Sequence, residues 1–196
     1  MTVHPASVRI LDAAARLFAE RGYQATTTRQ IADLAEVNEV TLFRGFGNKQ
    51  GVLAAVVERV VAEMPGRAAP DLSGLPLREA VTEMANREVT NGLRDGGLMT
   101  RLAFEAGTVP EVAELFAGGP QANLAAVAAF FADRQRAGQV RTDLAAETIA
   151  EAFFGLTSSF VIMRTVLGFE AGSDQEVRQA VAALVEVLLT GAEGQR

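Results

Sequence analysis

Residues 26–51, TTTRQIADLAEVNEVTLFRGFGNKQG, contain two short helical patterns separated by only a few residues. Thr27 followed three positions later by Gln30 predicts a capping box, which marks the start of a helix. Asn38 is a good N-cap for a second helix, which Gly45 and Gly47 end. Two short helices joined by a turn of about three residues form a helix-turn-helix unit.

Helical periodicity continues on both sides of this unit, and no stretch alternates like a β-strand for long. Upstream, an alanine-rich amphipathic helix ends at Arg21, where Gly22 suits the left-handed position that closes a helix. Downstream, helical patterns occupy residues 49–64, 76–94, 98–106, 109–117, 120–137, 144–167 and 175–190. The sequence therefore predicts an all-α protein.

The composition of the 196 residues argues against several functions. There is no Cys, which excludes disulfides, thiol catalysis and thiolate metal sites. His4 is the single histidine, and no glycine-rich phosphate loop follows a strand, so metal centres and catalytic triads have too few candidate residues. We predict that the protein is not an enzyme and has no metal and no cofactor.

Membrane insertion and export also find no support in the sequence. The N-terminus lacks the charged-then-apolar order of a signal peptide. The longest apolar run, AFFGLTSSFVIM at residues 152–163, is too short to cross a bilayer. We therefore expect a soluble cytoplasmic protein with no membrane partner.

The charge is unevenly distributed along the chain. The formal net charge is −6, yet residues 1–50 hold six basic and five acidic side chains, while the rest holds 12 basic and 19 acidic ones. An acidic total is weak evidence against nucleic-acid binding, because only the docking face of such a protein must be positive.

The second helix of a helix-turn-helix enters the major groove of DNA with its N-terminal part. With Val37, Leu42 and Phe46 facing inward, a set of six side chains remains on the outer side: Asn38, Glu39, Val40, Thr41, Phe43 and Arg44. Thr41 suits a base edge or a thymine methyl, and Arg44 suits guanine or phosphate. Lys49, the only lysine, begins the next helix and is expected to anchor a backbone phosphate.

The stretch RILDAAARLFAERGYQATTTRQIADLAEVNEVTLFRGFGNKQGVLAAVV resembles the N-terminal DNA-binding domain of TetR-type transcriptional regulators. The resemblance implies a homodimeric repressor whose C-terminal half binds a small-molecule effector and then releases a double-stranded DNA operator. It places a helix-turn-helix DNA-binding domain at residues 1–50 and a larger helical ligand-binding and dimerisation domain at residues 51–196. By position, Thr27, Thr28 and Arg29 would contact phosphate, Thr41 and its neighbours would contact bases, and Lys49 would hold phosphate.

This sequence departs from the family pattern at three positions. Phe43 replaces a common tyrosine, Gly45 replaces a common histidine, and Glu39 stands where a basic or neutral residue is usual. Two phosphate contacts are thereby lost, which predicts weak or unusually selective operator binding. Glu39 either accepts a hydrogen bond from a cytosine amino group or caps its own helix, and we favour the cap.

The last two helices are apolar on more than one face, so each needs more than one packing partner. The family resemblance implies that the pair joins its mate in a four-helix dimer interface, and an ordinary monomer core is the alternative. The interface prediction comprises Leu156, Phe160, Met163, Val181, Leu184 and Leu188.

Aromatic and methionine side chains in the middle of the chain suit an apolar ligand cavity, although each of them also suits an ordinary core. The predicted pocket comprises Met84, Phe104, Phe130, Phe131 and Phe153. Glu83, Glu88 and Glu105 would meet a cationic ligand if buried, and would otherwise form a solvated face.

Two functions remain in competition. The first is a sequence-specific DNA-binding regulator that a small, largely apolar ligand releases from a palindromic operator. The family resemblance implies that this regulator is a repressor. The second is an all-α ligand-binding or partner-binding protein without specific DNA binding. Tight, palindrome-dependent binding of a defined duplex distinguishes the first from the second.

Overall fold

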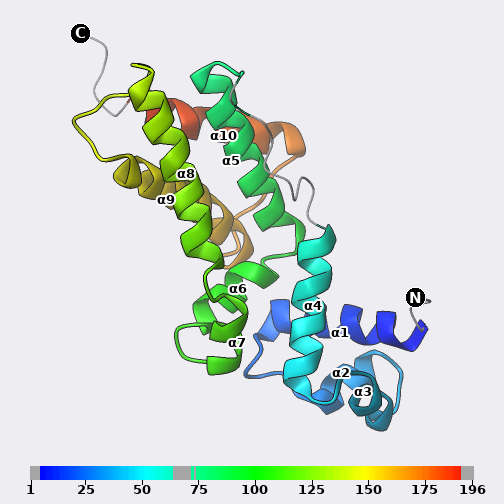
Figure 1. Cartoon of the computed structure of the whole chain (residues 1–196). Helices are drawn as coiled ribbons and strands as arrows, with labels where there is room; N and C mark the ends of the chain where they lie inside the picture. Colours follow the sequence, from blue (N-terminus) through cyan, green and yellow to red (C-terminus); the bar gives the residue numbers. More distant parts are fainter. Residues whose placement is uncertain (1–4, 64–71, 73, 191–196) are drawn as a thin grey trace. The chain divides into compact units, whose positions relative to one another are not determined.

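The computed structural model describes residues 5–63, 72 and 74–190, and it is all-helical in that part of the chain (Figure 1). The prediction of an all-α fold is confirmed. The helices are α1 (Pro5–Arg21), α2 (Thr28–Leu34), α3 (Glu39–Phe46), α4 (Lys49–Glu63), α5 (Leu77–Arg94), α6 (Leu98–Glu105), α7 (Pro110–Leu115), α8 (Gly119–Arg136), α9 (Ala146–Thr165) and α10 (Asp174–Thr190). His4 and residue 64, the last of the predicted fourth helix, lie outside the described residues.

The helices divide between two packing units. Unit 1 contains α1–α4 together with α6 and α7, and unit 2 contains α5, α8, α9 and α10. The packing units therefore alternate along the chain: α5 belongs to unit 2, although α4 before it and α6 after it belong to unit 1. The functional division at residue 50 stays a prediction, since a packing unit and a functional domain need not coincide.

Unit 1 is built around α1, whose apolar face is fully buried. Helices α2, α3, α4 and α6 contact α1, and α7 packs against α6 and α4; α2 and α3 lie side by side at the end of α4 (Figure 1). The most deeply buried side chains of this core are Ile10, Ala14, Phe18, Ile31, Leu42, Val52, Leu53, Val56, Leu102 and Val112. Burial of such side chains is the main favourable contribution to the folding of helices as short as α2 and α3.

Unit 2 packs long helices through apolar faces. α9 contacts α5, α8 and α10, and α5 also contacts α10. The approach of α5 to α9 is close at Gly92, where an added Cβ would lie 2.9 Å from both methyl carbons of Val161. The core of the unit includes Val81, Val89, Phe131, Ala150, Phe153, Val161 and Val181.

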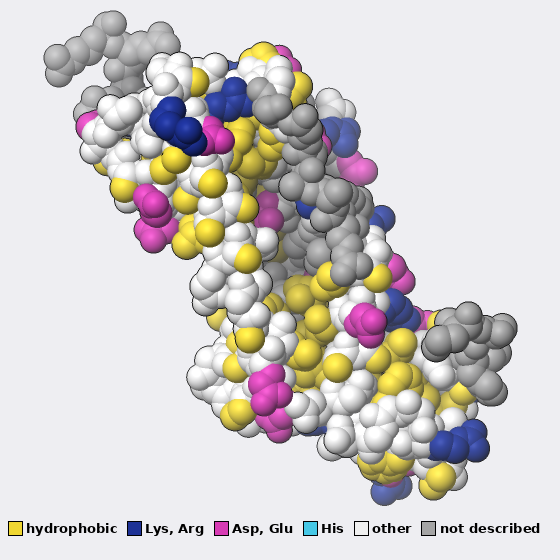
Figure 2. Space-filling view, viewed as in Figure 1, with side chains coloured by type: hydrophobic (Ala, Val, Ile, Leu, Met, Phe, Trp, Pro, Cys, Tyr) yellow, Lys and Arg dark blue, Asp and Glu magenta, His cyan; other side chains and the backbone are white. Residues whose placement is uncertain are grey.

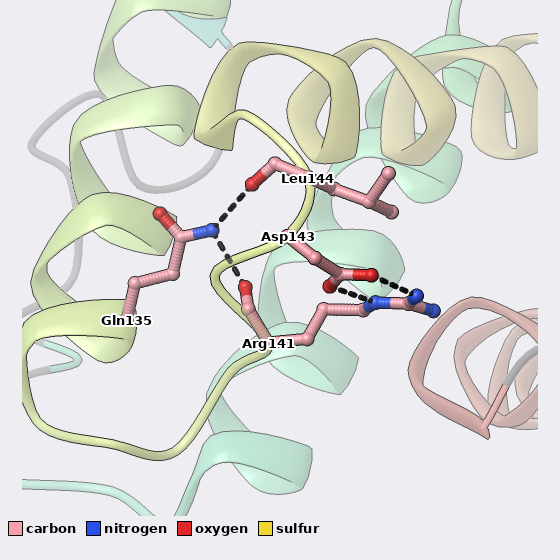
Figure 3. Close-up of polar contacts among 4 residues, drawn as sticks. All are labelled: Gln135, Arg141, Asp143 and Leu144. Carbon is pink, nitrogen blue, oxygen red and sulfur yellow. Dashed lines mark hydrogen bonds and ion pairs between the residues drawn. The ribbon is translucent and has the colours of Figure 1, made fainter.

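Polar side chains hold the loops of unit 2. Arg134 is buried and donates hydrogen bonds from one guanidinium nitrogen to the carbonyl oxygens of Leu72 and Leu75, at 2.8 and 3.0 Å. In the loop between α8 and α9, the Gln135 side-chain amide donates to the carbonyl oxygens of Arg141 and Leu144, at 2.7 and 2.8 Å (Figure 3). These bonds fix how α8 leads into α9.

Two stretches of the described residues, Pro110–Arg136 and Ala146–Thr165, are long and apolar enough by composition to cross a membrane. The first is divided between α7 and α8 by Gly118, whose φ is +79°. The second is α9, which contributes Phe153, Phe160 and Val161 to the core of unit 2. Core helices of soluble proteins pass the same test of composition.

Candidate nucleic-acid interface

The turn between α1 and α2 sets the direction in which the helix-turn-helix begins. Gly22 has φ of +84°, as the sequence predicted, and its N–H donates to the carbonyl oxygen of Phe18 at 2.9 Å. The buried Thr26 hydroxyl donates to the carbonyl oxygen of Gly22 at 2.7 Å. These bonds satisfy backbone groups that the end of α1 would otherwise leave unpaired.

The start of α2 is the capping box that the sequence predicted. The Gln30 N–H donates to the Thr27 hydroxyl at 3.2 Å, and the Thr27 N–H donates to the Gln30 side-chain oxygen at 2.9 Å. The Thr27 side chain is exposed, as is Arg29. Both side chains are therefore accessible to a partner at the N-terminal end of α2.

The start of α3 is capped by Asn38, whose side-chain oxygen accepts a hydrogen bond from the Val40 N–H at 2.9 Å. Leu42 is fully buried, and Val37 and Phe46 pack against the core, so the predicted inner face is confirmed. On the outer face Val40 is 69% exposed and Phe43 is 44% exposed. Solvent-exposed apolar side chains of this size on a short, well-capped helix suit a binding surface.

Glu39 makes a contact that neither sequence-based alternative contained. Its Oε1 atom accepts a hydrogen bond of 2.6 Å from the Thr28 hydroxyl. Thr28 is the first residue of α2 and Glu39 is the first of α3, so this bond joins the N-terminal ends of the two helices. The side-chain hydrogen bond that caps α3 comes from Asn38, which accepts from the Val40 N–H, while Glu39 lies in the first turn as an acidic residue.

Lys49 is half-buried beneath the turn between α1 and α2. Its Nζ atom donates to the carbonyl oxygens of Tyr23 and Thr26, both at 2.9 Å, and lies 4.2 Å from the centre of the Tyr23 ring. Burial lowers the pKa of Lys49, and the negative charges of Glu111 and Glu105 act in the opposite direction. The ammonium group is thus hydrogen-bonded within the protein, whereas the sequence led us to expect that it would bind a phosphate.

Glu105 belongs to the same turn, and sequence reasoning missed this role. Its carboxylate accepts hydrogen bonds from the N–H groups of Tyr23 and Gln24, both at 3.1 Å. It also lies so close to Gly22 that a Cβ there would be 1.9 Å from Glu105 Oε1. Glu105 is 82 and 81 positions from its two partners, so no local sequence pattern connects them. The only signal in the sequence was a charged residue at the end of a predicted helix.

The residues predicted to contact DNA come together on one end of unit 1. Figure 2 shows basic side chains on the surface formed by α2 and α3. Arg44, Asn38 and Gly45 are exposed, and Thr41 and Thr28 are half-buried. Lys49 is the member of the predicted set whose polar group is directed into the turn instead.

The predicted pocket residues fall into two groups. Four of them lie in unit 2: Met84 and Phe130 are half-buried, and Phe131 and Phe153 are buried in the core. Phe104 belongs to α6 in unit 1 and is 60% exposed. Of the three acidic residues considered for a cationic ligand, Glu83 is exposed and Glu105 is engaged with the backbone, while burial raises the pKa of Glu88.

The predicted dimer residues differ in burial. Val181 and Phe160 are buried in the core of unit 2, whereas Leu156, Leu184 and Leu188 are half-buried and Met163 is partly exposed. The same end of α9 and the following loop expose further apolar side chains, namely Val166, Leu167 and Phe169. On α10, Val187 is 51% exposed.

A capped helix-turn-helix with an exposed outer helix defines a class of DNA-binding regulators. Two family models match this chain. "Bacterial regulatory proteins, tetR family" matches residues 10–56, and "AefR-like transcriptional repressor, C-terminal domain" matches residues 79–191. The chain belongs to the tetR family of bacterial regulatory proteins, a family of DNA-binding transcriptional regulators that are not enzymes.

Individual relatives agree with this assignment. The chain is 49% identical over 57 residues to an uncharacterized HTH-type transcriptional regulator, YvkB of Bacillus subtilis, which is 29% of this chain and 30% of that protein. It is 34% identical over 106 residues to the HTH-type transcriptional repressor Rv3405c of Mycobacterium tuberculosis, or 54% of each chain. The chain thus spans between 30% and 54% of the length of these curated relatives.

The fold is also found among solved structures. The tetR-family regulator PfmR from Thermus thermophilus superposes with a TM-score of 0.77 at 18% sequence identity, over 95% of this chain and 100% of that one. At this level of identity the likeness extends to the fold alone.

Proposed function

We propose that the protein is a homodimeric repressor that binds a palindromic operator and is released by a small, largely apolar ligand. The observation that carries the proposal is the outer face of α3, which presents Val40, Phe43 and Arg44 on a helix held in place at its N-terminus. Repression is supported by the relative Rv3405c, which is a repressor. A regulator of bacterial DNA acts in the cytoplasm.

The proposed DNA contacts follow the exposed groups of α2 and α3. Backbone phosphate contacts come from the N-terminal end of α2, where Thr27 and Arg29 are exposed. Base contacts come from the first turns of α3, with Thr41 and Arg44 as polar members and Val40 and Phe43 as apolar ones. Asn38, Thr28 and Glu39 complete the set, whereas Lys49 supports the turn behind α2.

The homodimer is supported by the apolar surface at the end of α9 and on α10. Met163, Val166, Leu167 and Phe169 are large side chains that are partly exposed in a single copy, together with Val187. A second copy of the chain would cover them, and a two-fold dimer provides the two DNA-binding units that a palindrome requires. Leu156, Leu184 and Leu188 would extend this interface, with Phe160 and Val181 beneath it.

The effector site is proposed for unit 2, next to Met84, Phe130, Phe131 and Phe153. Phe130 and Phe131 pack edge to face with ring centres 5.4 Å apart. An aromatic and aliphatic lining of this kind suits a mainly apolar ligand. Phe104 lies on α6 in unit 1 and is not part of this proposed site.

The first experiment is a selection of duplexes from a randomised pool by the purified protein at near-physiological salt. We expect enrichment of a palindrome with half-sites about one helical turn apart. Transcription in vitro from a promoter that overlaps the selected site should fall when the protein is added, and small apolar compounds can then be screened for restoring it. Absence of any enriched palindrome, or a rise in transcription, would contradict the proposed repressor.

The Thr41→Ala variant tests which helix reads the bases. It should relax the preference at one base position in each half-site, because a single base-edge contact is removed. The Thr100→Ala variant is the matched control, since Thr100 lies on α6 of the same unit. Equal base preferences in the wild type and Thr41→Ala would show that α3 does not carry this contact.

A further inference from the structure

Glu39 is held in place by the adjacent helix of the helix-turn-helix. The Thr28 hydroxyl donates to Glu39 Oε1 at 2.6 Å, and the Glu39 side chain is only half-buried. A long acidic side chain at the start of a helix normally samples several rotamers, and this bond restricts them. The position of the carboxylate is therefore set by α2 and not by Glu39 alone.

Asn38, and not Glu39, provides the side-chain hydrogen bond that caps α3. The Asn38 side chain accepts from the Val40 N–H at 2.9 Å. Glu39 Oε2 makes no hydrogen bond or ion pair within the residues that the structure describes, whereas Oε1 has its partner in Thr28. The carboxylate thus keeps free acceptor capacity at the N-terminal end of the helix that is proposed to enter the major groove.

A carboxylate that only accepts hydrogen bonds discriminates between bases. On its own major-groove edge, cytosine presents an amino donor and no acceptor. Adenine presents an amino group beside the N7 acceptor, and guanine and thymine present acceptors at their edges. Guanine and thymine edges would repel the carboxylate, and adenine N7 would weaken the contact, so cytosine is the base that matches.

We propose that Glu39, held by the Thr28 hydroxyl, is a specificity-determining residue that selects cytosine at one position of each operator half-site through its N4 amino group. This inference rests on the proposed function, because it requires that α3 enter the major groove. It also assigns Thr28 as the positioning residue for Glu39. The Thr28 hydroxyl then does not donate to phosphate while it donates to Glu39.

The test is duplex selection with the full chain and four variants. Wild type should select cytosine at the position concerned by about tenfold over the other bases, within the usual range for one good base contact. Glu39→Gln should move the preference toward adenine, because an amide both donates and accepts and so matches adenine N6 and N7. Glu39→Ala should abolish the preference at that position and leave the others unchanged.

Thr28→Val and Glu36→Gln complete the design. Valine keeps the shape of threonine without the hydroxyl, so Thr28→Val should broaden the cytosine preference without changing the preferred base. Glu36→Gln removes the same charge from an exposed side chain of the helix-turn-helix outside α3, and should leave every base preference intact.

The outcomes separate the two proposals. If wild type and Glu39→Gln select the same bases and Glu39→Gln merely binds every duplex more tightly, Glu39 acts through its charge alone and the inference is wrong. If Thr28→Val leaves the cytosine preference as sharp as in wild type, the positioning role of Thr28 is wrong. If wild type selects no palindrome, the proposed function itself fails and the inference fails with it.

Discussion

Unit 1 and unit 2 hold their helices in different ways. In unit 1, α2 and α3 have seven and eight residues, and side-chain hydrogen bonds fix both of their N-terminal ends. In unit 2, the helices have 17 to 20 residues and pack through broad apolar faces. Short helices are marginal without such caps, whereas long amphipathic ones gain most of their stability from packing.

The difference teaches where each unit is sensitive to mutation. The position of the outer face of α3 depends on a few polar atoms as well as on the core beneath it, so substitutions of those polar groups should change DNA binding more than they change stability. The core of unit 2 depends on volume, so substitutions there should mainly change stability. The following predictions test this contrast, beginning with the largest expected effect.

Phe131→Ala should have the largest effect on stability. Phe131 is fully buried in unit 2, and its truncation should lower the free energy of unfolding by about 3–5 kcal/mol because it leaves a cavity. The measurement is denaturant unfolding followed by circular dichroism. Phe104→Ala is the matched control, since Phe104 is 60% exposed and should lose under about 1 kcal/mol. Equal losses for the two variants would contradict the assignment of the core.

Lys49→Met should weaken unit 1 and DNA binding together. Removal of the ammonium takes one donor from each of the carbonyl oxygens of Tyr23 and Thr26, although Tyr23 keeps the Thr26 N–H, and should cost about 1–3 kcal/mol in unfolding free energy. We expect weaker operator binding with an unchanged salt dependence. Arg59→Met is the control, because Arg59 is a cation of the same helix in a surface ion pair with Asp12.

The salt dependence separates the two roles of Lys49. The sequence predicted a phosphate contact, whose loss lowers the slope of log affinity against log salt by about 1. A slope reduced in this way, with stability unchanged, would restore that prediction and contradict the role of Lys49 in the turn.

Thr27→Ala should cost about 1 kcal/mol, because it removes the hydroxyl that accepts from the Gln30 N–H. Thr90→Ala makes the same substitution at an exposed position within α5, where alanine is the better helix former. The two variants should therefore change the thermal midpoint in opposite directions. A loss of stability in both would show that the cap contributes little.

Glu88→Gln should have the smallest effect, and one that depends on pH. Burial raises the pKa of Glu88 above its ordinary value of 4.5. The folded state then binds the proton more tightly than the unfolded state, so stability falls as pH rises from about 4.5 through the folded pKa. Glu88→Gln should remove this fall and be slightly more stable than wild type at neutral pH.

Glu83→Gln is the control for Glu88, because Glu83 is an exposed acidic residue on the same helix. The measurement is the unfolding free energy of wild type and both variants over about four pH units, from about pH 4 to about pH 8. If the unfolding free energy of Glu88→Gln falls with pH as steeply as that of wild type, groups other than Glu88 cause the pH dependence.

The parts of the fold and site that the sequence predicted are those encoded by neighbouring residues. Thr27 and Gln30 are three positions apart, Asn38 adjoins its helix, and Gly22 follows α1 directly, so local geometry determines each contact. Amphipathic periodicity likewise predicted the helices and the burial of Leu42.

The contacts that the sequence did not predict depend on how helices cross. Thr28 meets Glu39 only because α2 and α3 pack at a particular angle, and Glu105 meets Tyr23 only because α6 returns to unit 1. For Lys49, the sequence showed that a cation lies at the start of a helix, but it did not show in which direction the side chain points. A long cation at a helix start suits an external phosphate and an internal carbonyl oxygen equally well, and only the packing of Tyr23 decides between them.

The burial of Lys49 beneath the turn has a practical consequence for chemical labelling of this protein. Lys49 carries the only side-chain amine in the sequence. Its lowered pKa makes the amine intrinsically easier to acylate, yet two carbonyl oxygens and an aromatic ring surround it in the folded turn. The rate at which an amine-reactive reagent modifies this side chain should therefore report how often the turn opens at the start of the helix-turn-helix.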